Sequence, residues 1–184
     1  MADIDRIYNP KSINFMTHWF NGPEIMDRLK EWGFFDAPAS TTHHGNYAGG
    51  LYDHSFTVAS TLAKLTRDNG LVWQHERSPW VVGMFHDLCK CDQYRVDKSL
   101  FAKDGTPCYG YNTEMLLKGH GDKSLMRCAS LLTLTEEEAM CIRYHMGAFT
   151  DKEEWSDYTR AIHKYPNALW THQADMIAAH VCGI

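Results

Sequence analysis

The segment Trp80–Lys90, which reads WVVGMFHDLCK, constrains the fold more than any other stretch of the chain. Ser78 as an N-cap and Pro79 at the first helical position predict a helix that begins here and runs to about Lys90. Its apolar residues predict burial in a core. The same segment ends in an adjacent imidazole and carboxylate, His86 and Asp87, and an ionised carboxylate is costly to bury without a partner. This helix therefore needs a compensating charge at its end.

The length of 184 residues fits a single domain, and we expect one domain over residues 1–184. The net charge is -5 and no block of lysines and arginines occurs, which argues against a surface for duplex nucleic acid. A small anionic substrate remains compatible with this composition, because a local site can be positive within an acidic protein. The 11 histidines are unusually many and suggest a search for metal ligands.

The six cysteines contain no C-x-x-C pair, which argues against a zinc ribbon or a thioredoxin-type motif. The N-terminal sequence MADIDRIYNP has no basic start and no apolar segment of a signal peptide. Nowhere do about 18 consecutive apolar residues occur, so no membrane span is expected. The sequence predicts a soluble protein of the reducing cytoplasm, and it does not indicate the oligomeric state.

Capping residues, prolines and glycines predict that most of the chain is helical. Among these signals are a capping box formed by Thr135 and Glu138 and helix stops at Gly33 and Gly70. We expect helices near residues 13–20, 23–33, 51–69, 78–90, 112–119, 122–132, 135–147 and 150–164, and a last helix after Pro166. Residues 36–50 are rich in turn formers and should be irregular. Asp104-Gly105 between aromatic-bearing flanks predicts a small β-hairpin insert near 93–111. The expected fold class is all-α, a helical bundle with this hairpin.

Histidines and aspartates recur on inward faces or at helix ends, each group on a different predicted helix: His54, His86 with Asp87, His120, His145 and Asp175. Each has an ordinary explanation when taken singly. A histidine on an apolar stripe is more often a packed core residue than a ligand, and His145 can complement the negative end of its helix dipole. Taken together, imidazole and carboxylate groups suit a divalent transition metal. A cation would also offset the burial of the two carboxylates.

The geometry of a helix limits how the adjacent pair can bind metal. Neighbouring residues on a regular helix point about 100° apart. His86 and Asp87 can therefore approach one ion only near a bend or helix end, or else serve two ions. The segment CKCDQY that follows is compatible with such an end.

The order H…HD…D resembles the HD superfamily, whose members are mostly metal-dependent phosphohydrolases on a helical bundle. The first histidine matches His54 in GGLYDHSFTVA, the doublet matches His86 and Asp87, and the final aspartate matches Asp175 in HQADMIAAH. The resemblance extends from about residue 44 to about residue 180. His120 in GHGDKS and His145 in RYHMG resemble the positions that supply a second metal in the binuclear branch.

The resemblance implies one or two divalent ions, with Mn, Fe, Ni, Zn and Mg all left open. It also implies a metal-activated hydroxide that cleaves a phosphomonoester or phosphodiester, with a nucleotide as the favoured substrate. Asp87 and Lys90 would be catalytic, Asp87 by bridging two ions. Lys90 matches the lysine of HD-x-x-K and would contact the phosphate, and Lys123 could also reach an anionic substrate.

Two other functions remain open at this point. A few HD-fold proteins with a similar ligand set use a di-iron centre to oxygenate small polar substrates, and imidazole with carboxylate suits iron as well as manganese. A non-catalytic module that binds metal or nucleotide is the other. We interpret His43 and His44 as loop residues and Arg143 as structural. His172, on the last helix, either orients Asp175 or is merely packed.

Overall fold

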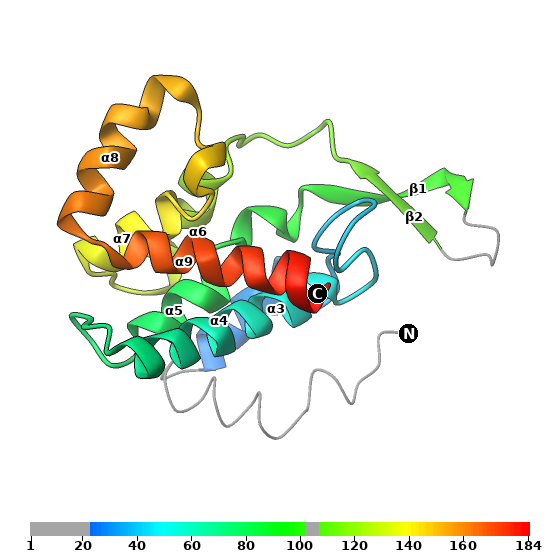
Figure 1. Cartoon of the computed structure of the whole chain (residues 1–184). Helices are drawn as coiled ribbons and strands as arrows, with labels where there is room; N and C mark the ends of the chain where they lie inside the picture. The colour runs from blue at the N-terminus through cyan, green and yellow to red at the C-terminus, as the bar shows by residue number, and fades with distance from the viewer. Residues whose placement is uncertain (1–22, 102–106) are drawn as a thin grey trace. The chain divides into compact units, whose positions relative to one another are not determined.

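The computed structural model describes residues 23–101 and 107–184, which are mostly helical with one two-stranded antiparallel sheet (Figure 1). The predicted helix near residues 13–20 and the predicted turn at 104–105 lie outside these ranges. By its internal contacts the chain forms two compact units, which we describe separately. The first unit comprises residues 1–52 and 90–114, and the second comprises residues 53–89 and 115–184. The prediction of one domain over the whole chain stays a prediction.

The first unit contains helix α3 (Pro23–Glu31) and the hairpin of strands β1 (Tyr94–Phe101) and β2 (Pro107–Tyr111). Tyr94 pairs with Tyr111, and the register shifts between Asp97 and Phe101. The predicted hairpin is thereby confirmed. The segment 36–49 is irregular as expected and contains both His43 and His44.

The helix predicted for residues 112–119 is wrong, because this segment forms turns. The Asn112 side chain is buried and donates to the carbonyl of Asp92, while its main-chain N–H donates to the carbonyl of Gln93. Its side-chain oxygen accepts from the N–H of Glu114, the local hydrogen bond that competes with helix formation. Asn112 therefore extends the base of the hairpin instead of starting a helix.

The second unit is built from helices only. They are the part of α4 (Gly50–Asn69) from Asp53 onward, α5 (Ser78–Phe85), α6 (Gly121–Leu131), α7 (Glu136–Arg143), α8 (Trp155–Lys164) and α9 (Asn167–Ile177). Short 3₁₀ turns occupy Leu88–Cys91, Gly147–Phe149 and Lys152–Glu154, and α9 continues as a π-helical turn at Ala178–Cys182. Helix α9 packs against α5, α7 and α8, and α6 packs against α7 (Figure 1).

Helices α4 and α5 approach closely where Gly83 faces Ala59. A Cβ atom at Gly83 would lie 2.3 Å from the Ala59 Cα, which is closer than real Cβ atoms come to other heavy atoms. Only glycine therefore allows this spacing of the two helices. The contact lies one helical turn before His86, so it sets the distance between the two helices that carry His54 and His86.

Two buried glutamates at the start of α7 hold the starts of other helices. Glu138 forms the predicted capping box with Thr135 and also accepts from the Ser78 hydroxyl at 2.9 Å. Glu137 accepts from the Asn167 side chain at 2.8 Å and from the Gln74 N–H at 3.0 Å. The expectation that Ser78 caps its own helix is therefore wrong, because its hydroxyl is used to join α5 to α7.

Helix α5 is also shorter than predicted, since it ends at Phe85 and not near Lys90. His86 and Asp87 lie in the turn between α5 and the 3₁₀ turn Leu88–Cys91. This is the helix end that the adjacent pair requires if both side chains are to face one region.

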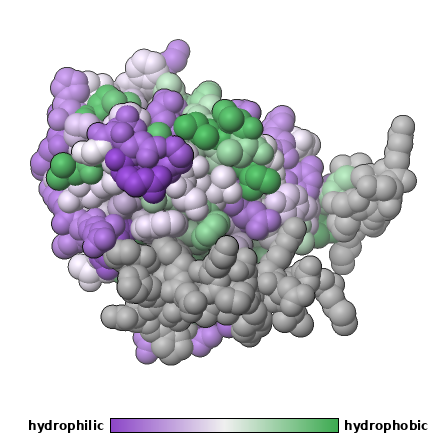
Figure 2. Space-filling view, turned by 60° about the horizontal axis from the view of Figure 1, so that its bottom comes forward, coloured by the Kyte–Doolittle hydropathy of each residue, from purple (hydrophilic) through white to green (hydrophobic). Residues whose placement is uncertain are grey.

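Apolar side chains at the surface are scattered. Leu116, Val72 and Val181 are the most exposed, at 98%, 85% and 79%. On the face shown in Figure 2, apolar patches lie among hydrophilic side chains. Within the described residues, no helix is both long enough and apolar enough to span a membrane.

Candidate metal centre

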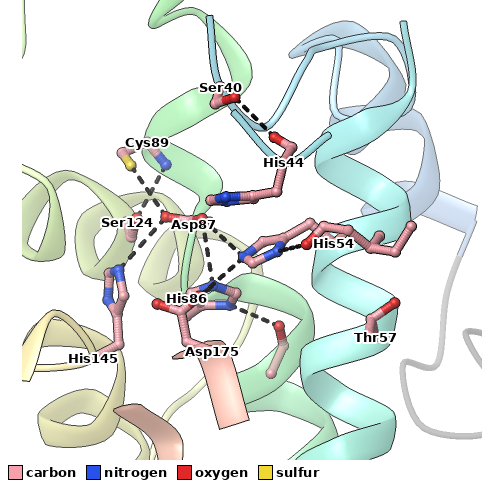
Figure 3. A network of polar contacts seen from close by, with 12 residues as sticks. Ser40, His44, His54, Thr57, His86, Asp87, Cys89, Ser124, His145 and Asp175 are labelled. Atoms are coloured by element: carbon pink, nitrogen blue, oxygen red, sulfur yellow. Dashed lines mark hydrogen bonds and ion pairs between the residues drawn. The ribbon is translucent and has the colours of Figure 1, made fainter. Parts of the chain in front are cut away.

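The six predicted metal ligands converge in the second unit, although they come from different elements. His54 lies on α4, His86 and Asp87 in the turn after α5, His120 before α6, His145 in the turn after α7, and Asp175 on α9. Figure 3 shows five of these side chains pointing toward one another. His54, His86 and His145 are fully buried and Asp87 is 2% exposed. Asp175 and His120 reach the surface in part, at 16% and 26% exposure.

Asp87 lies at the middle of this cluster, and each of its carboxylate oxygens faces two imidazoles. Oδ2 is 3.5 Å from His54 Nε2 and 3.4 Å from His86 Nε2. Oδ1 is 2.9 Å from His120 Nε2 and 3.5 Å from His145 Nε2. Ligands that lie about 2.0 to 2.2 Å from one tetrahedral ion are separated from each other by about 3 to 4 Å. The spacing therefore suits two ions, one at each oxygen of Asp87.

Asp175 lies beside the two histidines that face Asp87 Oδ2, which is the expected position of the first ion. Its Oδ1 is 3.1 Å from His54 Nε2 and 3.9 Å from His86 Nε2. We call His54, His86, Asp87 and Asp175 the first ligand group, and Asp87, His120 and His145 the second. Within each of three overlapping triads of these residues, one ligand atom per residue lies within 4.8 Å of the others.

Main-chain carbonyls fix which ring nitrogen of each buried histidine carries the proton. The Nδ1–H of His86 donates to the Gly83 carbonyl at 2.8 Å, and that of His145 donates to the Ile142 carbonyl at 2.7 Å. His54 Nδ1 lies 2.9 Å from the Ile184 carbonyl in the same way. A carbonyl oxygen only accepts, so the proton is on Nδ1 and Nε2 presents a lone pair. This is the usual second-shell arrangement of metal-binding histidines.

The lone pairs of His86 and His145 are both buried, and within the described ranges neither Nε2 has a hydrogen-bond partner. Both point at carboxylate oxygens, which are also lone-pair donors. Buried polar atoms without partners are rare because they cost free energy. A cation between the imidazoles and the carboxylates would satisfy all of them. The donor set therefore fits divalent metal ions, as the sequence predicted.

The charges of the cluster favour a cation as well. Burial by itself lowers the pKa of His120, but the neighbouring Cys89 and Asp87 outweigh it and raise that pKa to about 9. Burial by itself raises the pKa of Asp175, but the adjacent imidazoles of His54 and His86, when protonated, outweigh it and hold that pKa well below its usual range. Without metal the site therefore keeps Asp175 ionised and favours a proton on His120, and a metal ion would take the place of that proton.

Two glycines place His120. Gly119 has a φ of +92°, a conformation that side chains rarely adopt. A Cβ atom at Gly121 would lie 1.9 Å from the Arg143 carbonyl oxygen, so α6 begins in direct contact with the end of α7. His120 and His145 are thereby brought together from the two helices.

His172 has neither of its two predicted roles in full. Its Nδ1–H donates to the main-chain carbonyl of His145 at 2.9 Å. It packs tightly on Gly147, where a Cβ atom would lie 2.5 Å from the His172 Cγ. His172 therefore orients the turn that carries His145, and among the described residues it makes no hydrogen bond with Asp175.

Sequence reasoning missed Cys89 and Ser124. The Cys89 N–H donates to the Ser124 hydroxyl at 3.0 Å, which joins the turn after α5 to helix α6. The Cys89 thiol lies 3.9 Å from Asp87 Oδ1. The position of Cys89 two residues after Asp87 was the only signal in the sequence, and a lone cysteine rarely indicates a role.

The two lysines predicted to contact the substrate, Lys90 and Lys123, belong to different units. Lys123 is 3% exposed, and its Nζ lies 3.3 Å from Met115 Sδ, so it is not a surface residue. Lys90 is 7% exposed and is assigned to the first unit, whereas the candidate ligands are assigned to the second. Contact of either lysine with a substrate stays a prediction. Arg143 pairs with Asp122 and Glu154, which supports its structural interpretation.

In comparisons with known proteins, no family model, no curated protein and no solved structure matches this chain.

Proposed function

We propose that the protein is a metal-dependent phosphohydrolase of the HD type, which cleaves a phosphomonoester or phosphodiester. One observation carries the proposal: the two oxygens of the buried Asp87 face two separate sets of imidazoles. A carboxylate in this position can be shared by two ions. Two-metal sites of this kind are common in phosphatases and nucleases. The order of the ligands along the chain, H…HD…H…H…D, supports the HD family.

The first ligand group would hold one ion and the second ligand group the other. Bound divalent metal lowers the pKa of water from about 15.7 toward 7 and polarises phosphoryl oxygens. The three carbonyl-bound histidines keep their Nε2 atoms aimed into the cluster, which limits the reorganisation that binding requires. Asp87 belongs to both ligand groups and would therefore fix the position of one ion relative to the other.

Lys123 is proposed to contact the phosphate. Lys123 follows His120 by three residues in the first turn of α6, so it projects from the same end of that helix. Its charge would offset the charge that develops on the transferred group.

The proposal is tested by hydrolysis of p-nitrophenyl phosphate and bis-p-nitrophenyl phosphate with Mn(II)-loaded protein. Wild type should hydrolyse at least one of them, and Asp87→Asn should lose at least 10²-fold in rate. Asp68→Asn is the matched control, because Asp68 is a partly exposed carboxylate on α4 that pairs with Lys64 and not with the cluster. Equal rates for wild type and Asp87→Asn would contradict the proposal.

A second preparation of the protein, loaded with iron, tests the oxygenase alternative. Iron-loaded protein is examined in air by electron paramagnetic resonance. A coupled di-iron signal together with no hydrolysis of either ester would replace the hydrolase by an oxygenase. Bound metal with neither activity would favour the non-catalytic module.

A further inference from the structure

A pocket of about 290 Å³ adjoins the second ligand group. We define the His120 pocket by the residues that line it on its ligand side and at its rim: His120, Asp122, Arg143, Phe149, Asp151 and Glu154. All of them belong to the second unit. His120 has a 26% exposed side chain and is a member of both the pocket and the ligand group. A substrate whose phosphate lies at the ligand groups can therefore extend past His120 into this pocket.

Charge in the pocket is unbalanced. Arg143 is the one cation at its rim, and its guanidinium is already held by Asp122 at 2.6 Å and by Glu154 at 3.1 Å. These two ion pairs hold the Arg143 guanidinium in place and partly neutralise its charge, so it attracts a further anion only weakly. Asp151 is exposed, and within the described ranges its carboxylate has no hydrogen bond or ion pair. The three carboxylates outnumber the two positive groups of the pocket, Arg143 and His120. The pocket therefore disfavours anions, and its carboxylates accept hydrogen bonds from hydroxyl and ammonium groups.

Size limits the ligand further. A water molecule takes about 30 Å³ in the liquid, so the pocket has room for a group about as large as ten waters. Pockets for drug-sized ligands span about 300 to 1,000 Å³, and this one lies at the lower end. A group of three to six carbons fits with room to spare, whereas a base with its ribose would have to fill the whole pocket. Phe149, which is 67% exposed, gives the rim an aromatic face that can contact the carbon skeleton or a cation.

We propose that the His120 pocket receives the alcohol portion of the substrate, and that the substrate is the phosphate monoester of a small alcohol rich in hydroxyl or ammonium groups. The inference rests on the proposed function for the reaction itself. Hydrolysis joins the oxygen of water to phosphorus, breaks the bond from phosphorus to the alcohol oxygen, and leaves a proton on that oxygen. The alcohol would stay in the pocket, and the released phosphate would stay at the ligand groups. A nucleoside would have to fill the whole pocket, and a nucleoside diphosphate would also bring its second anionic group near the carboxylates, so both should bind more weakly.

The ligand proposed for the His120 pocket can be tested by binding measurements that do not require hydrolysis. Isothermal titration calorimetry with Mn(II)-loaded full-length protein compares methylene phosphonate analogues, in which carbon replaces the ester oxygen. The analogues are those of glycerol phosphate, ethanolamine phosphate, adenosine monophosphate and adenosine diphosphate. We expect at least one of the first two to bind ten times or more as tightly as either adenosine analogue. Equal or tighter binding of an adenosine analogue, or no binding of any of the four, would overturn the proposal.

A charge reversal tests the pocket itself. Asp151→Lys should weaken binding of the ethanolamine analogue and strengthen that of the diphosphate analogue, each by about tenfold. Glu153→Lys is the matched control, since this exposed glutamate lies two residues away and does not line the pocket. At physiological salt, where screening acts over about 8 Å, the control should change neither value more than twofold. The same response to both variants would show that the pocket does not bind the ligand.

The two proposals fail in different ways. If no phosphate ester is hydrolysed but the binding order and the response to Asp151→Lys hold, the hydrolase is wrong and the pocket assignment stands. If hydrolysis is strong but nucleotides are preferred, the hydrolase stands and the pocket assignment is wrong.

Discussion

At the scale of single residues, Asp87 matters because it belongs to both ligand groups, whereas the other five ligands each belong to one. Loss of a ligand from one group should therefore leave the other largely intact. The second group contains His120 and His145, and the first contains His54, His86 and Asp175. The two groups share no histidine, so replacement of a single histidine should remove metal from one group and leave it in the other.

His120→Ala should bind about one Mn(II) per chain, and Asp87→Ala should bind none. Removal of one ligand or its orienting partner commonly costs 10- to 100-fold in metal affinity, and removal of the shared ligand acts on both positions. Elemental analysis after gel filtration gives the ratio. His163→Ala, at an exposed position on α8, is the control and should match wild type. Equal metal content in His120→Ala and wild type would refute the second position.

Cysteine reactivity gives a second test at this scale. Burial is the largest cause that raises the pKa of the Cys128 and Cys141 thiols, which therefore stay protonated well above neutral pH. Cys182 is exposed. The thiolate is the reactive form, so iodoacetamide at pH 8 should label Cys182 at least tenfold faster than Cys128 or Cys141. Peptide mass spectrometry measures the three rates, and labelling in denaturant, where they should converge, is the control. Equal rates in the folded protein would contradict the burial of the two thiols.

At the scale of elements, glycines set the distances between the helices that carry ligands. Gly83 allows α5 to lie against α4, and Gly121 allows α6 to lie against the end of α7. A side chain at either position must move a helix, because the neighbouring atoms are main-chain or Cα atoms that cannot rotate away.

Gly83→Ala should lose stability by about 1 to 3 kcal/mol and weaken metal binding at the first position at least tenfold. The added methyl group would separate α4 from α5 and so move His54 away from His86. Urea unfolding and Mn(II) titration measure the two effects. Gly70→Ala is the control. Gly70 has a φ of +64°, which alanine adopts with strain, but an added Cβ atom would meet no atom within 4 Å. This variant should therefore lose stability and keep its metal affinity. Unchanged metal affinity in Gly83→Ala would contradict the role of this contact.

The sequence predicted elements best where the signals are local. The capping box of Thr135 and Glu138 and the glycine stops at Gly33 and Gly70 all marked helix ends correctly. It failed where a side chain has a distant partner: Ser78 bonds to Glu138, and Asn112 bonds to Asp92. Residue type and order, together with the resemblance to the HD superfamily, predicted which six residues form the cluster that could hold metal. Their pairing across Asp87, and the burial of Lys123, depend on packing that spacing along the chain does not reveal.

At the scale of the whole molecule, all six ligands lie in the second unit, and they come from both of its chain segments, 53–89 and 115–184. Metal would link helices that are far apart in the sequence. Because the ligands are assembled only in the folded state, metal binding should add to stability by mass action.

Saturating Mn(II) should raise the thermal midpoint of the wild type by about 5 to 10 °C. At a free concentration of 100 times the Kd, binding contributes about 2.7 kcal/mol, and 1 kcal/mol shifts the midpoint of a chain of this size by about 2 to 4 °C. Differential scanning calorimetry with and without EDTA gives the shift. The Asp87→Ala protein should show no shift, and an equal shift in both proteins would place the stabilising ion elsewhere.

The most direct test of the central claim is an anomalous difference map from a crystal of the Mn(II)-loaded protein. We predict two peaks about 3.5 to 4 Å apart, the typical spacing of two-metal sites, with one at each carboxylate oxygen of Asp87. The first should contact His54, His86 and Asp175, and the second should contact His120 and His145. A map with no peak at Asp87, or with manganese bound only at other residues, would contradict the account.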